Sequence, residues 1–84
     1  MYKIYIVFEG KKKNERLFEM INSFNLKKIA NESFEKEFNF LINKKFEKVM
    51  ELKAIALVII EEKAHHDFKI IKSKLFTKEG EFYV

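Results

Sequence analysis

Two segments of this 84-residue chain are apolar on both of their alternating faces. Residues 2–8 carry isoleucine and phenylalanine on one face and tyrosine and valine on the other, and residues 54–60 consist of aliphatic side chains alone. Strands with this pattern are typical of a sheet that is covered from both sides. The pattern therefore predicts two buried strands within one sheet.

The helical periodicity of the sequence predicts only two helices, which are enough to cover one face of such a sheet. Apolar side chains at helical spacing predict a short helix over residues 14–24, with Asn14 as its N-cap. A longer helix is predicted over residues 33–52, with Ser33 at its start. Residues 26–30 fit a connector or a minor strand equally well.

Two positions depart from the apolar stripe of the longer predicted helix. Lys45 falls inside the stripe, and Phe40 falls nearly opposite it. We therefore expect either a bend near residues 43–44 or an exposed aromatic side chain at Phe40, which would then be available to a partner.

The C-terminal third of the chain completes the predicted sheet. Residues 68–76 and 81–84 have the composition of strands, and residues 77–80 between them fit a turn with Gly80 in the left-handed region. The predicted order is β-α-α-β-β-β. We expect a single small α+β domain over residues 1–84, with two helices on one face of a mostly antiparallel four-stranded sheet.

The second face of that sheet has no predicted helix to cover it. At about 25 cal/mol per Å², exposing several hundred Å² of apolar surface costs several kcal/mol, which is comparable to the stability of a small domain. A partner protein or a second copy of the chain would remove that cost, and irregular cover by the chain's own termini is the alternative. The residues expected to meet the partner are Tyr5, Val7, Val58 and Ile60.

The charge of the chain favours loose contact with polyanions over sequence-specific reading of a duplex. Basic residues outnumber acidic ones by 17 to 13, and all but Arg16 are lysine. Lysine is a flexible point charge, whereas arginine reads guanine and phosphate through a rigid fork. Phosphates could bind the loop before the first predicted helix, and lysines interleaved with aromatic residues around Phe68 and Phe76 could support nucleobase stacking. The expected phosphate contacts are Lys11, Lys12, Lys13 and Arg16; a solvated loop is the alternative reading.

The chain lacks most of the residues and motifs that common catalytic mechanisms require. The chain has no cysteine, and none of its serines lies in a Gly-x-Ser-x-Gly turn. If the two buried strands were parallel neighbours, carboxylates and imidazoles at one rim could hold a divalent cation for phosphodiester hydrolysis. The ligands of that metal site would be Glu9, Glu61 and either His65 or His66. This set is sparse, so we expect no catalytic residue, metal or cofactor.

The remaining features indicate a small accessory protein. Lys, Ile, Phe, Asn and Tyr, which have AT-rich codons, make up 45 of the 84 residues. In character the chain resembles phage and mobile-element accessory proteins, anti-CRISPR-type inhibitors among them. We expect a non-enzymatic, cytoplasmic protein that acts by stoichiometric contact with a macromolecular partner or by self-association, without a signal peptide or membrane segment. The alternatives are a Lys-rich nucleic-acid-binding protein and, with less support, the metal-dependent nuclease.

Overall fold

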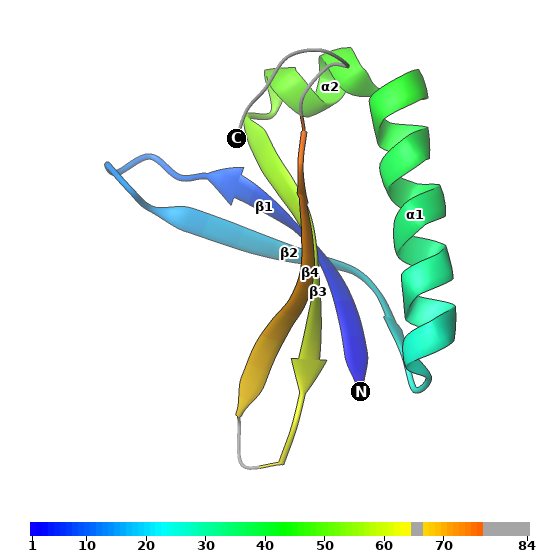
Figure 1. The fold of residues 1–84 in the computed structure, drawn as a ribbon. Helices are drawn as coiled ribbons and strands as arrows, with labels where there is room; N and C mark the ends of the chain where they lie inside the picture. Colours follow the sequence, from blue (N-terminus) through cyan, green and yellow to red (C-terminus); the bar gives the residue numbers. More distant parts are fainter. Residues whose placement is uncertain (65–66, 77–84) are drawn as a thin grey trace.

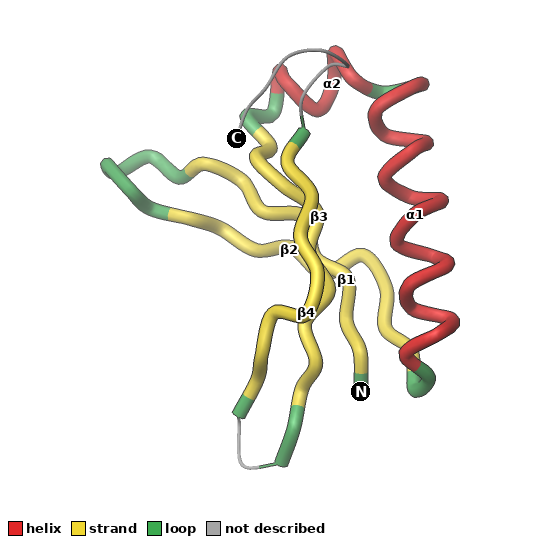
Figure 2. Tube along the Cα trace, in the orientation of Figure 1, coloured by secondary structure: helices red, strands yellow, loops and turns green. Residues whose placement is uncertain are grey.

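The computed structural model of the chain describes residues 1–64 and 67–76, which form a four-stranded sheet with helices on one side. The strands lie in the order β2-β1-β3-β4, and each neighbouring pair is antiparallel. Figure 1 shows α1 lying along one face of the sheet, and Figure 2 marks the strands and helices along the chain. The predicted α+β class is confirmed. The elements are β1 (Tyr2–Glu9), β2 (Arg16–Phe24), α1 (Lys27–Lys44), α2 (Phe46–Glu51), β3 (Ala54–Glu62) and β4 (Phe68–Leu75).

The predicted element order is wrong at residues 14–24, which form strand β2 instead of a helix. The observed order is β-β-α-α-β-β, with β2 paired to β1 in a hairpin. The register shifts between Ile4 and Tyr5, which leaves Ile21 as an extra residue on β2. This bulge breaks the strand alternation, so the apolar residues of β2 imitate helical spacing. Asn14 lies in the hairpin loop with a φ of 63° and caps no helix.

Strand β4 corresponds to the third predicted strand, at residues 68–76. The predicted turn at residues 77–80 and the predicted terminal strand at residues 81–84 lie outside the described residues. In the described sheet, β2 supplies the fourth strand, a role that the sequence analysis assigned to residues 81–84.

The longer helix starts and ends earlier than predicted. Helix α1 begins after Leu26, which makes no side-chain capping hydrogen bond, so no capping residue marks its start. Ser33, the predicted start, lies inside α1. Lys45 departs from helical geometry, with φ −131° and ψ 20°, and separates α1 from α2. Of the two alternatives offered by the sequence, both are found: the helix breaks at Lys45, just after residues 43–44, and Phe40 is exposed.

The main core lies between the helices and the sheet. Ile4, Phe34, Leu57 and Ile59 are its fully buried large side chains. Phe34 stacks on Phe38, with ring centroids 6.5 Å apart, and Phe38 stacks on Phe76 at 5.5 Å. This aromatic column joins α1 to the end of β4, so the first face of the sheet is closed by the chain itself.

Candidate functional site

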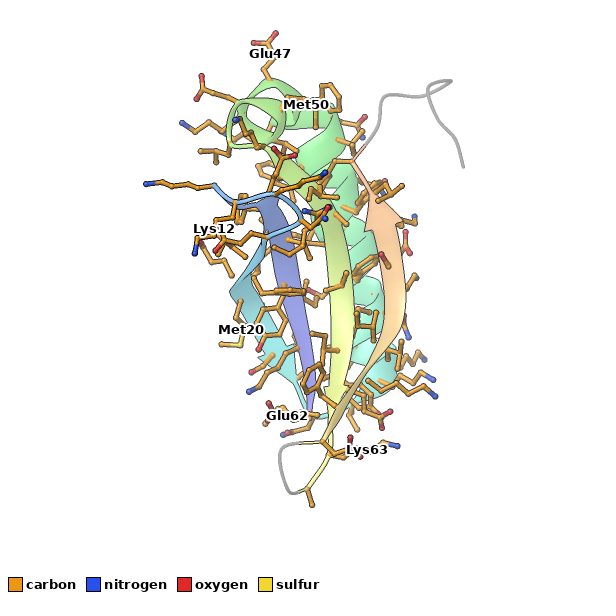
Figure 3. The ribbon with its side chains drawn as sticks, turned by 90° about the vertical axis from the view of Figure 1, so that its left-hand side faces the viewer. Lys12, Met20, Glu47, Met50, Glu62 and Lys63 are labelled. Atoms are coloured by element: carbon orange, nitrogen blue, oxygen red, sulfur yellow. The ribbon has the colours of Figure 1, made fainter. Side chains whose placement is uncertain are left out.

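The face of the sheet opposite α1, here called the open face, carries apolar side chains from all four strands. Figure 3 looks onto this face, with α1 behind the sheet and α2 at its upper end. Its centre is a second buried cluster, against which Tyr5 and Ile55 pack. Ile55 joins this cluster because a register shift near the start of β3 changes the alternation there. The floor of the open face consists of Val7, Ala56, Val58 and Ile60, which are only 4–8% exposed.

A rim of strongly exposed apolar side chains surrounds this floor. Residues directly opposite each other in antiparallel strands share a face, and the register places Phe18 beside Val7 and Ile70 beside Ile60. A hollow of about 300 Å³ opens between Tyr5, Phe18, Ile60, Glu62 and Phe68. The rim residues are Phe18, Met20, Phe68, Ile70 and Leu75, which are 49–63% exposed.

The residues that sequence reasoning assigned to a partner thus form the floor of the open face, not its contact surface. All four lie on this face, but Val7, Val58 and Ile60 are already buried within one chain, and Tyr5 is half-buried. The rim was missed because β2 was taken for a helix. In β4, alternation identifies Phe68 and Ile70, but the register shift that leaves Ile71 as an extra residue hides Leu75 from it.

The open face has few free positive charges. Lys3 donates a hydrogen bond of 3.0 Å to the carboxylate of Glu62, and this contact raises the pKa of Lys3 above its usual value. The lysines of β4 point to the opposite face, because Lys72 is paired with Ile59 and Lys74 with Leu57. The described strands therefore do not form the lysine-and-aromatic platform that was considered as an alternative.

The aromatic residue expected beside those lysines is also occupied elsewhere. Phe76 is buried and stacks on Phe38 in the main core, so it cannot stack on a nucleobase. Phe82 and Tyr83, two further aromatic residues considered for stacking, lie outside the described residues.

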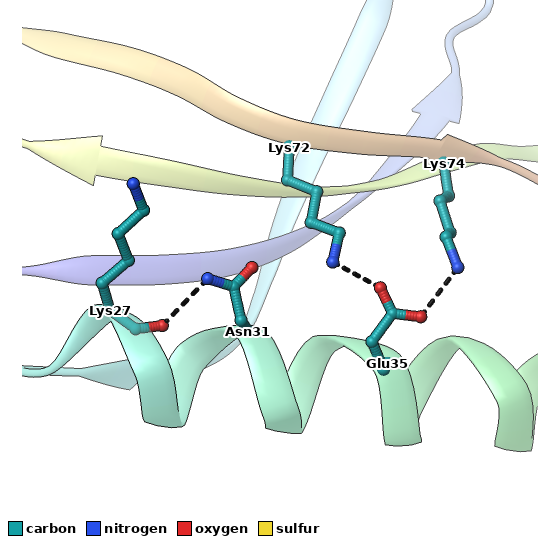
Figure 4. Close-up of polar contacts among 5 residues, drawn as sticks. All are labelled: Lys27, Asn31, Glu35, Lys72 and Lys74. Carbon is teal, nitrogen blue, oxygen red and sulfur yellow. Dashed lines mark hydrogen bonds and ion pairs between the residues drawn. The ribbon is translucent and has the colours of Figure 1, made fainter.

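Glu35 forms ion pairs with two of the three lysines of β4, Lys72 and Lys74, and ties that strand to α1 (Figure 4). The ammonium of Lys74 lies 2.7 Å from the carboxylate, and Lys72 binds its other oxygen. The hydrogen bonds from Lys72 and then from Lys74 lower the pKa of Glu35 below its usual value. The same ammonium groups lie about 5 Å from the ring centres of Phe34 and Phe38.

We expect Glu35→Gln to lower the free energy of unfolding at neutral pH by about 0.5–1 kcal/mol, because the pair is partly exposed and screened. The folded pKa of Glu35 is depressed, so its contribution is complete above the unfolded pKa of about 4.3 and is lost as the pH falls through the folded value. Urea unfolding at several pH values measures this.

The matched control is Glu32→Gln, on the same helix, where no described ion pair is lost. It should leave the stability nearly unchanged. A difference between wild type and Glu35→Gln that persists unchanged below pH 3 would contradict the assignment to the carboxylate charge.

The predicted phosphate loop lies at the tip of the β1–β2 hairpin and not before a helix. The loop is closed by the Gly10 N–H, which donates to the Glu15 carbonyl at 2.9 Å, and by the Lys12 N–H, which donates to the Glu15 carboxylate at 3.1 Å. No helix begins after this loop, so the helix dipole that was expected to favour phosphate binding there is absent. The basic tip consists of Lys11, Lys12, Lys13 and Arg16, for which no ion pair is found within the described residues.

The geometry assumed for the metal site is wrong. Strands β1 and β3 are antiparallel, so Glu9 and Glu61 lie at opposite ends of the sheet. Glu61 instead accepts a hydrogen bond of 3.4 Å from the Tyr2 hydroxyl. His65 and His66 lie outside the described residues, and the part of the chain that is described contains no group of three metal-ligating side chains.

Phe40 is the exposed aromatic side chain of α1, at 49% exposure. The helix lies behind the sheet when the open face is viewed (Figure 3), so Phe40 belongs to a different side of the molecule. A partner seated on the open face would therefore not contact it.

Comparison with known proteins gives no guide to function: no family model, no curated protein and no solved structure matches the chain. Among the described helices, none is long and apolar enough to cross a membrane.

Proposed function

We propose that the chain is a non-enzymatic binding protein whose open face docks onto another protein. The observation that carries this proposal is the exposed rim of aromatic, aliphatic and methionine side chains around an apolar floor. Aromatic residues and methionine are enriched at protein interfaces, where lysine is depleted. The rim has this composition although the chain as a whole is rich in lysine.

The charges of the open face favour a protein over a nucleic acid as the partner. Nucleic acid binding depends on cations that neutralise phosphates. On the open face, Lys3 is engaged by Glu62, and on β4 the ammonium groups of Lys72 and Lys74 are held by Glu35 on the other side of the sheet. Stacking surface is present, but the cations that the described strands place on this face are few: Lys3 is paired with Glu62, and Arg16 lies beside Glu9 at the end of β2.

A protein of this size and build would act by occupying a surface of its partner in a fixed stoichiometry. The many residues with AT-rich codons favour an origin in a phage or mobile element. In that setting the chain would act as an inhibitor that blocks a larger enzyme. This setting is part of the proposal and rests on sequence character alone.

The basic hairpin tip supports a second candidate function, polyanion binding. The hairpin extends away from α1 (Figure 1), and its lysines have no described ion-pair partner. Nucleic acid held only by this tip would bind without sequence preference and with a steep dependence on salt.

We expect Phe68→Glu to weaken binding of a protein partner, co-purified with the wild-type chain, by at least tenfold, since loss of an aromatic anchor and burial of a carboxylate in its place cost on the order of 2 kcal/mol. The matched control is Phe40→Glu, an exposed phenylalanine on α1 that should bind as the wild type does. Native mass spectrometry of the complex should show a fixed stoichiometry, and titration calorimetry measures the affinities. Circular dichroism verifies that both variants are folded.

Three results would overturn this proposal. Loss of binding in Phe40→Glu but not in Phe68→Glu would move the contact to the helical side. A partner that proves to be nucleic acid would favour the basic tip, as would binding that is lost in the double variant Lys11→Glu with Lys13→Glu and falls linearly with the logarithm of salt concentration.

A further inference from the structure

We propose that the free edge of β2 is a self-association site, which pairs antiparallel with β2 of a second copy and joins the two sheets into one of eight strands. This inference concerns the margin of the sheet, goes beyond the proposed docking of the open face, and does not depend on it.

The edge of β2 is long and has no strand beside it in the described sheet. In the described sheet β2 has β1 as its only neighbour, so the backbone groups on its other side face solvent. Residues 16–23 are all exposed, and only Phe24 at the end of the strand is half-buried. Figure 3 shows β2 at the margin of the sheet, with Met20 projecting there.

The contrast with the other margin of the described sheet is informative. Strand β4 carries Lys69, Lys72 and Lys74 within eight residues. Strand β2 has no lysine in nine residues, although 16 of the 84 residues of the chain are lysine. Lysine on an edge strand discourages pairing with other chains. The β2 edge carries Arg16, Glu19 and the bulge at Ile21, but it has no lysine, which the composition of the chain would readily supply.

Strand β2 also presents apolar side chains to both faces of the sheet. Phe18 and Met20 lie on the open face beside Val7 and Tyr5, and Leu17 lies on the opposite face beside Phe8. Leu17 is half-exposed despite facing the helical side. A strand added to this edge would cover apolar surface on both faces while satisfying the backbone.

The charges of β2 are compatible with a second copy in antiparallel orientation as the occupant. A two-fold axis through Met20 places Glu19 opposite the partner's Ile21, so no like charges face each other. The same axis sends the two basic hairpin tips to opposite ends of the paired strands. Nine residues at about 3.4 Å each separate them by at least about 30 Å, well beyond a Debye length of about 8–10 Å. The net charge of +4 per copy is therefore no obstacle.

The test is sedimentation velocity of the full chain from micromolar to millimolar concentration. We expect a reversible monomer–dimer equilibrium whose upper species has twice the mass of 10.2 kDa. Met20→Lys brings two ammonium groups together at the axis and should weaken the dimer at least tenfold. Leu52→Lys, on a side chain equally exposed at 51% but remote from β2, should leave it unchanged.

A chain that stays monomeric at every concentration would overturn the proposal. So would an equal loss of association in Ile70→Lys, because Ile70 lies on the open face but not on β2, and the copies would then meet face to face. If Met20→Lys fails to fold, amide hydrogen exchange of the wild type decides. Protection of β2 amides should rise with protein concentration, and unchanged exchange rates in β2 would reject the pairing.

Discussion

Replacing Phe34 by alanine is expected to lower the free energy of unfolding by about 3–5 kcal/mol, the usual cost of removing a fully buried phenylalanine. Phe34 has no exposed surface, stacks on Phe38, and lies under the ammonium group of Lys72. Its removal would leave a cavity at the point where α1 meets the sheet. For a domain of this size the midpoint of thermal unfolding should fall by more than about 10 °C.

Phe40→Ala is the matched control, because it makes the same substitution six residues further along α1, at a half-exposed position. We expect it to cost less than about 1 kcal/mol in the same urea and thermal unfolding experiments. If the two variants lost equal stability, the closed core between α1 and the sheet would not be the main source of stability.

The strands that could be predicted from sequence are those whose composition alone excludes other structures. Residues 54–60 are all aliphatic and mostly β-branched. This composition predicts a strand that is buried on both faces, and β3 is buried at most of these positions. Strand β2 could not be recognised in this way. Its bulge at Ile21 disturbs the alternation, and its backbone is organised by pairing with β1, a contact that local propensity does not contain.

The helix boundaries show a related limit. Ser33 is a good N-cap by type, yet α1 starts at Lys27 without a side-chain cap. The start is fixed by packing, since Ala30, one turn into the helix, is fully buried in the main core. Lys45 within the apolar stripe indicated an irregularity here, but the sequence left a bend and an exposed Phe40 as alternatives, and the structure has both.

The uncovered face could be predicted from the sequence in outline, but its contact residues could not. The central residues Val58 and Ile60 indicated an apolar second face. Which side chains stand exposed on it depends on the edge strands, and hence on the order β2-β1-β3-β4. The face on which the lysines lie also depends on strand pairing. Lys72 and Lys74 lie on the helical side because the register of β4 pairs them with Ile59 and Leu57 of β3.

The sheet therefore has two apolar faces, one covered by α1 and one uncovered. Substitutions at adjacent residues of β3, which point to opposite faces, can measure how well each face is packed. Ile59 is fully buried in the main core, while Ile60 belongs to the floor of the open face and is 8% exposed. Both are isoleucine in the same strand, so strand propensity and transfer free energy are matched. The difference between Ile59→Ala and Ile60→Ala therefore measures how well each side is closed.

We expect Ile59→Ala to lower the free energy of unfolding by about 4 kcal/mol and Ile60→Ala by about 2 kcal/mol, near the two ends of the range for such substitutions. Around Ile59 the stacked core of α1 cannot collapse into the cavity. Around Ile60, the side chains of Tyr5 and Phe68 line an open hollow and can move inward, with water filling the rest. Urea unfolding at low micromolar concentration measures both. A loss for Ile60→Ala that equals or exceeds that for Ile59→Ala would mean that the open face is a fully closed core in solution, so that no contact surface is left on it for a partner.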